Sequence, residues 1–177
     1  MKTIKINLYN FNELSEKVQK EVIENQRLLM TEYTWDNDAL KSLQKFAEHF
    51  NSELKDWSID FFNYGPSHVK FMEVEEMEET ELKDLILKMG SYNKDTLKGL
   101  GDCKFTGVCF DESVCDGARK AFFEGERDIN EILQAGFNTW LEDVQSDTEY
   151  LQSDKAIIET IEANEYTFEE NGRMNNG

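Results

Sequence analysis

The side chains of this 177-residue chain that are best suited to chemistry are its carboxylates, and they gather in two places. Six glutamates fall within the nine positions from Glu73 to Glu81. A second group, Asp111, Glu112 and Asp116, follows thirty residues later. Clustered carboxylates either bind a divalent metal ion or offer negative charge to a basic partner. The residues around them decide between these two uses.

A zinc site is not indicated by the cysteines and histidines. Cys103, Cys109 and Cys115 are each six positions apart, whereas zinc ligands usually come in pairs two to four residues apart. His49 and His68 lie far from them in the sequence. We therefore predict small buried thiols with no assigned role, and no metal.

Calcium and phosphate-binding motifs are absent as well. The stretch Asp111–Gly117 comes nearest to a calcium loop but lacks its alternating ligands and its glutamate. Gly99-Leu100-Gly101 lacks the following glycine and lysine of a phosphate-binding loop. The sequence predicts no cofactor and indicates no catalytic residue. A metal-dependent RNA nuclease remains an alternative, because carboxylates can converge in the fold without a sequence motif.

The overall charge narrows the class of partner. The chain has 19 Lys and Arg against 37 Asp and Glu, a net charge of −18. That excess argues against direct DNA binding by the free protein and against an anionic membrane surface. With 12 Phe, 6 Tyr and 3 Trp, the chain is too aromatic for a disordered acidic segment. Residues 1–50 contribute 7 positive and 8 negative side chains, so nearly all of the net charge falls in the remainder.

This asymmetry indicates either a well-solvated surface or an acidic face that fits the basic groove of a partner protein, with carboxylates where phosphates would lie. The expected partner contacts come first from the glutamate run and second from the later group. They are Glu73, Glu75, Glu76, Glu78 and Glu79, followed by Asp111, Glu112 and Asp116.

The secondary-structure elements that position these residues predict an α+β fold, in which several helices pack on a small antiparallel sheet. Alternating apolar residues predict strands at 4–8, 57–61, 69–71 and 166–168. Helical spacing predicts helices at 15–30, 36–50, 80–89 and 111–123, a long one from 128 to 151, and one from 154 to 161. We expect one domain over residues 1–172 and a frayed tail at 173–177.

No apolar run is long enough for a membrane span, and no signal peptide is recognisable, so a cytoplasmic location is expected. The length of the carboxy-terminal helix leaves room for a dimer interface.

Three segments resemble a family of uncharacterised proteins of phages and prophages of Gram-positive bacteria, whose members are labelled antitoxins of a toxin–antitoxin stability system. The segments are Ile6–Arg27, Cys103–Glu112 and Glu149–Arg173. The middle of the chain departs from the family, since Phe62–Pro66 stands where relatives carry a Gly- and Trp-rich stretch.

The phage setting implied by this resemblance, together with the acidity, favours an inhibitor of a host defence nuclease of the anti-CRISPR type. The expected partner is a basic host protein, such as Cas9 or its guide-RNA complex, in the bacterial cytoplasm. An antitoxin that neutralises a partner toxin is the second hypothesis. The RNA nuclease is the third, so the sequence leans away from an enzyme without deciding it.

Overall fold

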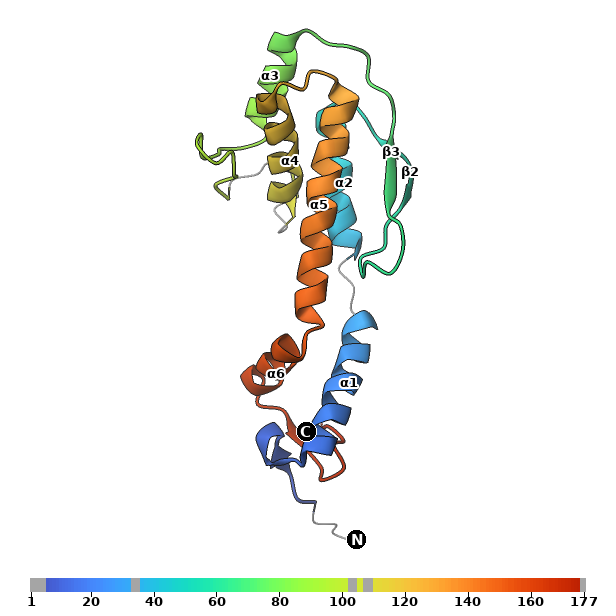
Figure 1. Cartoon of the computed structure of the whole chain (residues 1–177), viewed down its shortest axis with the longest axis vertical. Coiled ribbons are helices and arrows are strands. Elements are labelled where there is room, and N and C mark those ends of the chain that lie inside the picture. Colours follow the sequence, from blue (N-terminus) through green and yellow to red (C-terminus); the bar gives the residue numbers. More distant parts are fainter. Residues whose placement is uncertain (1–5, 33–35, 102–104, 107–109, 176–177) are drawn as a thin grey trace. The chain divides into compact units, whose positions relative to one another are not determined.

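The computed structural model describes residues 6–32, 36–101, 105–106 and 110–175. Over these residues the regular structure consists mainly of six α-helices and two separate antiparallel pairs of short strands (Figure 1). The predicted α+β class is confirmed, and so is the long helix near the carboxyl end, α5 (Ile129–Leu151). The chain divides into two compact units: unit 1 is Met1–Thr34 with Glu149–Gly177, and unit 2 is Trp35–Thr148.

Unit 1 brings the two ends of the chain together. Strand β1 (Tyr9–Asn10) pairs antiparallel with β4 (Thr167–Phe168) and leads into a 3-10 turn, η1 (Phe11–Glu13). Helix α1 (Glu16–Glu32) packs along α6 (Asp154–Ala163), whose amino terminus is capped by the Ser153 hydroxyl. Their apolar faces enclose a small core. Its buried members are Phe11, Leu14, Val22, Ile23, Ile157, Ile161 and Phe168.

The strands of unit 1 differ from those predicted. Positions 4 and 5 of the predicted first strand lie outside the described residues, and Ile6 and Leu8 are exposed and outside any strand. The pairing begins only at Tyr9, which lies opposite Phe168 of β4. At the other end, the Asn175 N–H donates to Thr167 O at 2.9 Å, so residues 173–175 pair back on β4 instead of fraying. Positions 176 and 177 of the predicted tail lie outside the described residues.

Unit 2 is built around α2 (Asp36–His49), α4 (Asp111–Glu124) and α5, which leaves the unit after Thr148 (Figure 1). Helix α3 (Glu79–Lys88) packs on α4, and β2 (Leu54–Ser58) pairs with β3 (His68–Phe71) as an antiparallel hairpin. The core of the unit is aromatic at its centre. Its largest buried side chains include Phe46, Phe50, Phe137, Trp140, Leu43, Leu82, Ile86 and Met89.

Two glycines allow the helices of unit 2 to approach closely. A Cβ atom added at Gly117 of α4 would lie 2.5 Å from the Ala135 carbonyl oxygen of α5. One added at Gly136 of α5 would lie 2.6 Å from Cζ of Phe46 in α2. Since real Cβ contacts do not come this close, only glycine fits at either position.

Three further expectations concern the whole chain. The single domain over residues 1–172 stays a prediction, because two compact units can still unfold in one cooperative step. None of the helices within the described residues combines the length and the apolar character needed to cross a membrane. The dimer also stays a prediction, and α5 offers it little support: its exposed positions are polar apart from Tyr150.

Candidate functional site

The glutamate run lies on the surface of unit 2, between β3 and α3. Residues 72–78 have no regular structure, and α3 begins at Glu79. Val74 and Met77 are half-buried and pack against the core of the unit, which fixes the direction of the whole segment. The charged residues between them therefore face solvent. All five first-ranked positions are exposed: Glu73, Glu75, Glu76, Glu78 and Glu79.

The turn between α4 and α5 holds this segment in place. The Val74 N–H donates to the Asn130 side-chain oxygen at 3.3 Å. Arg127 donates from Nε and Nη2 to Glu79 Oε1 at 2.9 and 2.8 Å, and its guanidinium lies over the Phe122 ring, 4.5 Å from the centroid. Both partners of the ion pair are about half exposed, so it contributes at most about 1 kcal/mol. Its main effect is to join the start of α3 to the turn.

The same turn adds carboxylates that the sequence analysis did not include. Glu126 Oε1 accepts the backbone N–H groups of Arg127 and Asp128, and Asp128 Oδ1 accepts that of Asn130 at 2.8 Å, which caps α5. A cavity of about 380 Å³ has Glu76 on its wall together with Asp128, so the run and the turn are neighbours. The clue in the sequence was the acidity of residues 124–131, which contain four carboxylates and a single arginine.

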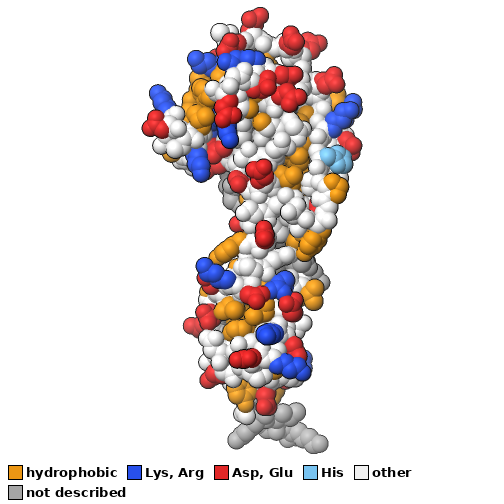
Figure 2. Space-filling view, viewed as in Figure 1, with side chains coloured by type: hydrophobic (Ala, Val, Ile, Leu, Met, Phe, Trp, Pro, Cys, Tyr) orange, Lys and Arg blue, Asp and Glu red, His pale blue; other side chains and the backbone are white. Residues whose placement is uncertain are grey.

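These residues form one surface, which we call the acidic surface. Figure 2 shows carboxylates gathered at the end of unit 2 that carries α3 and the α4–α5 turn, with a few lysines and arginines at the margin. Arg127 is the cation of this surface, and it is already bound to Glu79. Among the described residues, the other carboxylates of this surface form no ion pair with a lysine or arginine. The acidic surface consists of Glu73, Glu75, Glu76, Glu78, Glu79, Glu126 and Asp128.

The second group of predicted contacts is directed inward. Asp111 is only 1% exposed, and its carboxylate accepts both the backbone N–H and the hydroxyl of Thr106, at 2.7 and 2.9 Å. Glu112 is half-buried, with its side chain packed against Gly99. These two residues hold neighbouring loops against α4 and contribute little to the exposed acidic surface.

Asp116 also binds within the unit. Its Oδ1 accepts the Gly99 N–H at 2.9 Å and Arg119 Nη1 at 3.1 Å. Burial raises the pKa of the Asp116 carboxyl, although the Gly99 N–H and the Arg119 guanidinium act in the opposite direction. Arg119 is 1% exposed and also donates to the Gly90 carbonyl at 3.2 Å, so the pair fastens residues 90–99 to α4.

The thiols and imidazoles do not come together as a metal site within the described residues. Cys103 and Cys109 lie outside those residues, and Cys115 is buried beside the Met89 carbonyl. His49 Nε2 lies 2.9 Å from the Leu85 carbonyl oxygen, and His68 is exposed on β3. In the part of the chain that is described, no three His, Cys, Asp or Glu side chains are placed to hold a metal ion.

A comparison with protein-family models, with curated proteins and with solved structures finds no match for the chain. Its function is therefore inferred from the geometry of its own residues.

Proposed function

We propose that the protein is an inhibitor that places its acidic surface on the basic nucleic-acid-binding surface of a host defence nuclease of the CRISPR type. The observation that carries the proposal is the exposure of five glutamates within seven positions, Glu73 to Glu79, next to the carboxylates of the α4–α5 turn. Unit 2 as a whole has 12 Lys and Arg against 25 Asp and Glu, a net charge of −13. The choice of a defence nuclease as the partner comes only from the phage resemblance expected from the sequence, which no family model matches.

The chemistry of such an inhibitor follows from the charges. A groove that binds nucleic acid is lined with lysine and arginine, and exposed carboxylates can take the places of phosphates in it. The summed field of the acidic surface would also speed association at low ionic strength. The half-buried Val74 and Met77 keep the glutamates on a fixed segment, so less conformational entropy is lost when the partner binds.

The test is a charge reversal with a matched control. The triple variant Glu73→Lys, Glu75→Lys and Glu76→Lys should weaken binding to a purified CRISPR nuclease about 100-fold, since each reversed charge at a wet interface is worth on the order of 1 kcal/mol. The control variant makes the same change in net charge on the exposed side of α5 and should keep its affinity. It carries Glu142→Lys, Asp143→Lys and Asp147→Lys.

Two outcomes would reject this proposal. Equal affinity for the first variant and the wild type would exclude the acidic surface as the contact. Binding to the nuclease that does not weaken between 50 and 500 mM salt would exclude an electrostatic interface, because such contacts are screened. If the protein silences a co-encoded toxin and binds no nuclease, the antitoxin hypothesis replaces the inhibitor.

A further inference from the structure

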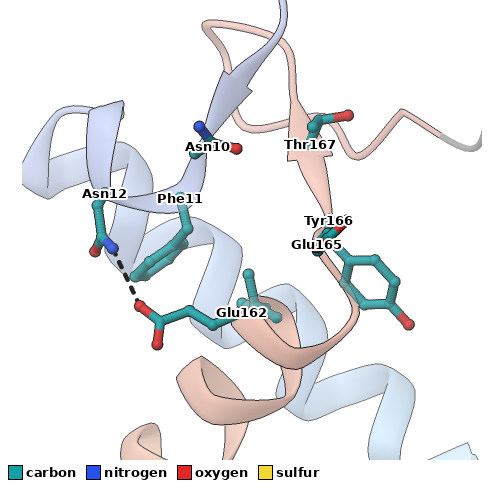
Figure 3. A pocket seen from close by; sticks show the side chains of 8 residues that line it. Asn10, Phe11, Asn12, Glu162, Glu165, Tyr166 and Thr167 are labelled. Carbon is teal, nitrogen blue, oxygen red and sulfur yellow. Dashed lines mark hydrogen bonds between the residues drawn. The ribbon is translucent and has the colours of Figure 1, made fainter.

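Unit 1 contains a cavity that is separate from the acidic surface of unit 2. It has a volume of about 460 Å³ and lies between the η1 turn and the end of α6 with β4 (Figure 3). Pockets for small ligands range from about 300 to 1,000 Å³, so a side chain with its backbone would fit. The floor is apolar, because Phe11 and Ile161 line it while belonging to the buried core of the unit.

The rim of this cavity is negatively charged. Glu162 and Glu165 line it, and no lysine or arginine is among the described residues that do. The Asn12 side chain donates from Nδ2 to Glu162 Oε1 at 3.1 Å, and Figure 3 shows the two side chains pointing toward each other. This bond uses one oxygen of the Glu162 carboxylate and leaves the other as an acceptor. The rim thus offers acceptors and negative charge above an apolar floor.

Glu165 occupies its place at a cost in backbone energy. The α6 helix ends in a Schellman motif: the Tyr166 N–H donates to Ile161 O and the Glu165 N–H to Glu162 O, both at 3.1 Å. In this motif the residue at the position of Glu165 is left-handed, and its φ is +52°. Glycine takes that conformation freely, whereas glutamate is strained in it. Helix termination alone therefore does not favour glutamate here, and strained residues are often found at ligand sites.

We propose that this cavity binds a guanidinium group, presented as an arginine side chain by a partner protein. Guanidinium carries five N–H donors and a permanent positive charge, which match the two carboxylates that line the cavity. Guanidinium is also more weakly hydrated than an ammonium, so it loses less when it enters a cavity with an apolar floor. This site lies in unit 1 and does not depend on the proposed inhibitor function.

The binding test uses the whole protein and Nα-acetyl-L-arginine amide as the probe. Titration followed by ¹H–¹⁵N correlation spectra should give saturable shifts at residues 10–12 and 161–167. The uncharged citrulline amide should bind about tenfold more weakly, because it lacks the charge-assisted bonds. Equal shifts with both amides, or no saturable shift at these residues, would overturn the proposal. Tighter binding of spermidine than of the arginine amide would overturn it as well, since a free polyamine would then be the better occupant.

Variants localise the effect to the two carboxylates. Glu162→Gln and Glu165→Gln should each weaken binding of the arginine amide about threefold, as expected for a partly exposed ion pair. Glu170→Gln, an exposed glutamate outside the cavity, is the matched control and should leave the affinity unchanged.

Glu165→Gly separates binding from folding. It removes the carboxylate and relieves the left-handed strain, so the variant should melt at a higher temperature and bind the amide more weakly. Unchanged binding in both Glu165 variants would show that this carboxylate holds no ligand.

Discussion

At the scale of single residues, the half-buried Asp116, paired with the buried Arg119, gives the clearest pH dependence. Burial raises the pKa of Asp116 above its ordinary value of 3.8, so the folded protein holds this proton more tightly than the unfolded chain does. A raised pKa means that the stabilisation is complete at low pH and is lost as the pH rises through the folded-state value.

We expect Asp116→Asn to remove this pH dependence. The amide oxygen can still accept from Gly99 and Arg119, but it has no proton to lose. Between about pH 3 and 7, the free energy of unfolding of the variant should therefore fall less with rising pH than that of the wild type. Urea unfolding at a series of pH values measures this pH dependence of the free energy of unfolding. The control for the loss of one charge is Asp84→Asn, which changes an exposed aspartate of α3. Parallel curves for the two variants would contradict the assignment.

At the scale of elements, the packing of α4 on α5 depends on Gly117. We expect Gly117→Ala to lower the free energy of unfolding by about 2 kcal/mol, because overpacking typically costs about 1–3 kcal/mol and outweighs the better helix propensity of alanine. The obstacle is backbone, the Ala135 carbonyl oxygen, which cannot turn aside as a side chain would. Gly65→Ala is the control, since its Cβ would meet only Asp60 at 3.5 Å and should change stability by less than about 0.5 kcal/mol. Equal unfolding midpoints for the two variants would argue against this packing.

The elements also show what could be predicted from the sequence. Helices α2, α4 and α5 were predicted nearly to the residue, because their apolar spacing and caps such as Asp128 are local signals. A strand was predicted at 166–168, but its pairing with β1 was not, because alternation within a segment does not reveal which distant segment it pairs with. The glutamate run was recognisable in the sequence, but its neighbours in the α4–α5 turn depend on contacts between segments far apart in the chain. The inward direction of Asp111 comes from its bonds to nearby Thr106, which no sequence motif marks.

At the scale of the whole molecule, the two units carry unequal charge. Unit 2 has a net charge of −13, and unit 1, with 7 Lys and Arg against 12 Asp and Glu, has −5. The ion pairs among the described residues are mostly local and exposed, as in Lys45 with Glu48, and such pairs stabilise the fold only weakly. Most carboxylates therefore repel one another across each unit, and this repulsion should be the main electrostatic term in the stability of the protein.

Salt should consequently stabilise the protein while it weakens partner binding. Raising sodium chloride from 50 to 500 mM shortens the screening length from about 14 to about 4 Å, which removes most of the long-range repulsion. We expect the free energy of unfolding to rise by about 1–2 kcal/mol, as measured by urea unfolding at neutral pH. The variant with Glu73, Glu75 and Glu76 changed to lysine has a net charge of −12 and should gain less from the same salt. Stability that is unaffected or lowered by salt would show that local ion pairs already compensate the negative charge.

Because salt should raise stability and weaken partner binding, a loss of binding at high salt cannot be caused by unfolding. The two measurements together therefore isolate the electrostatics of the acidic surface.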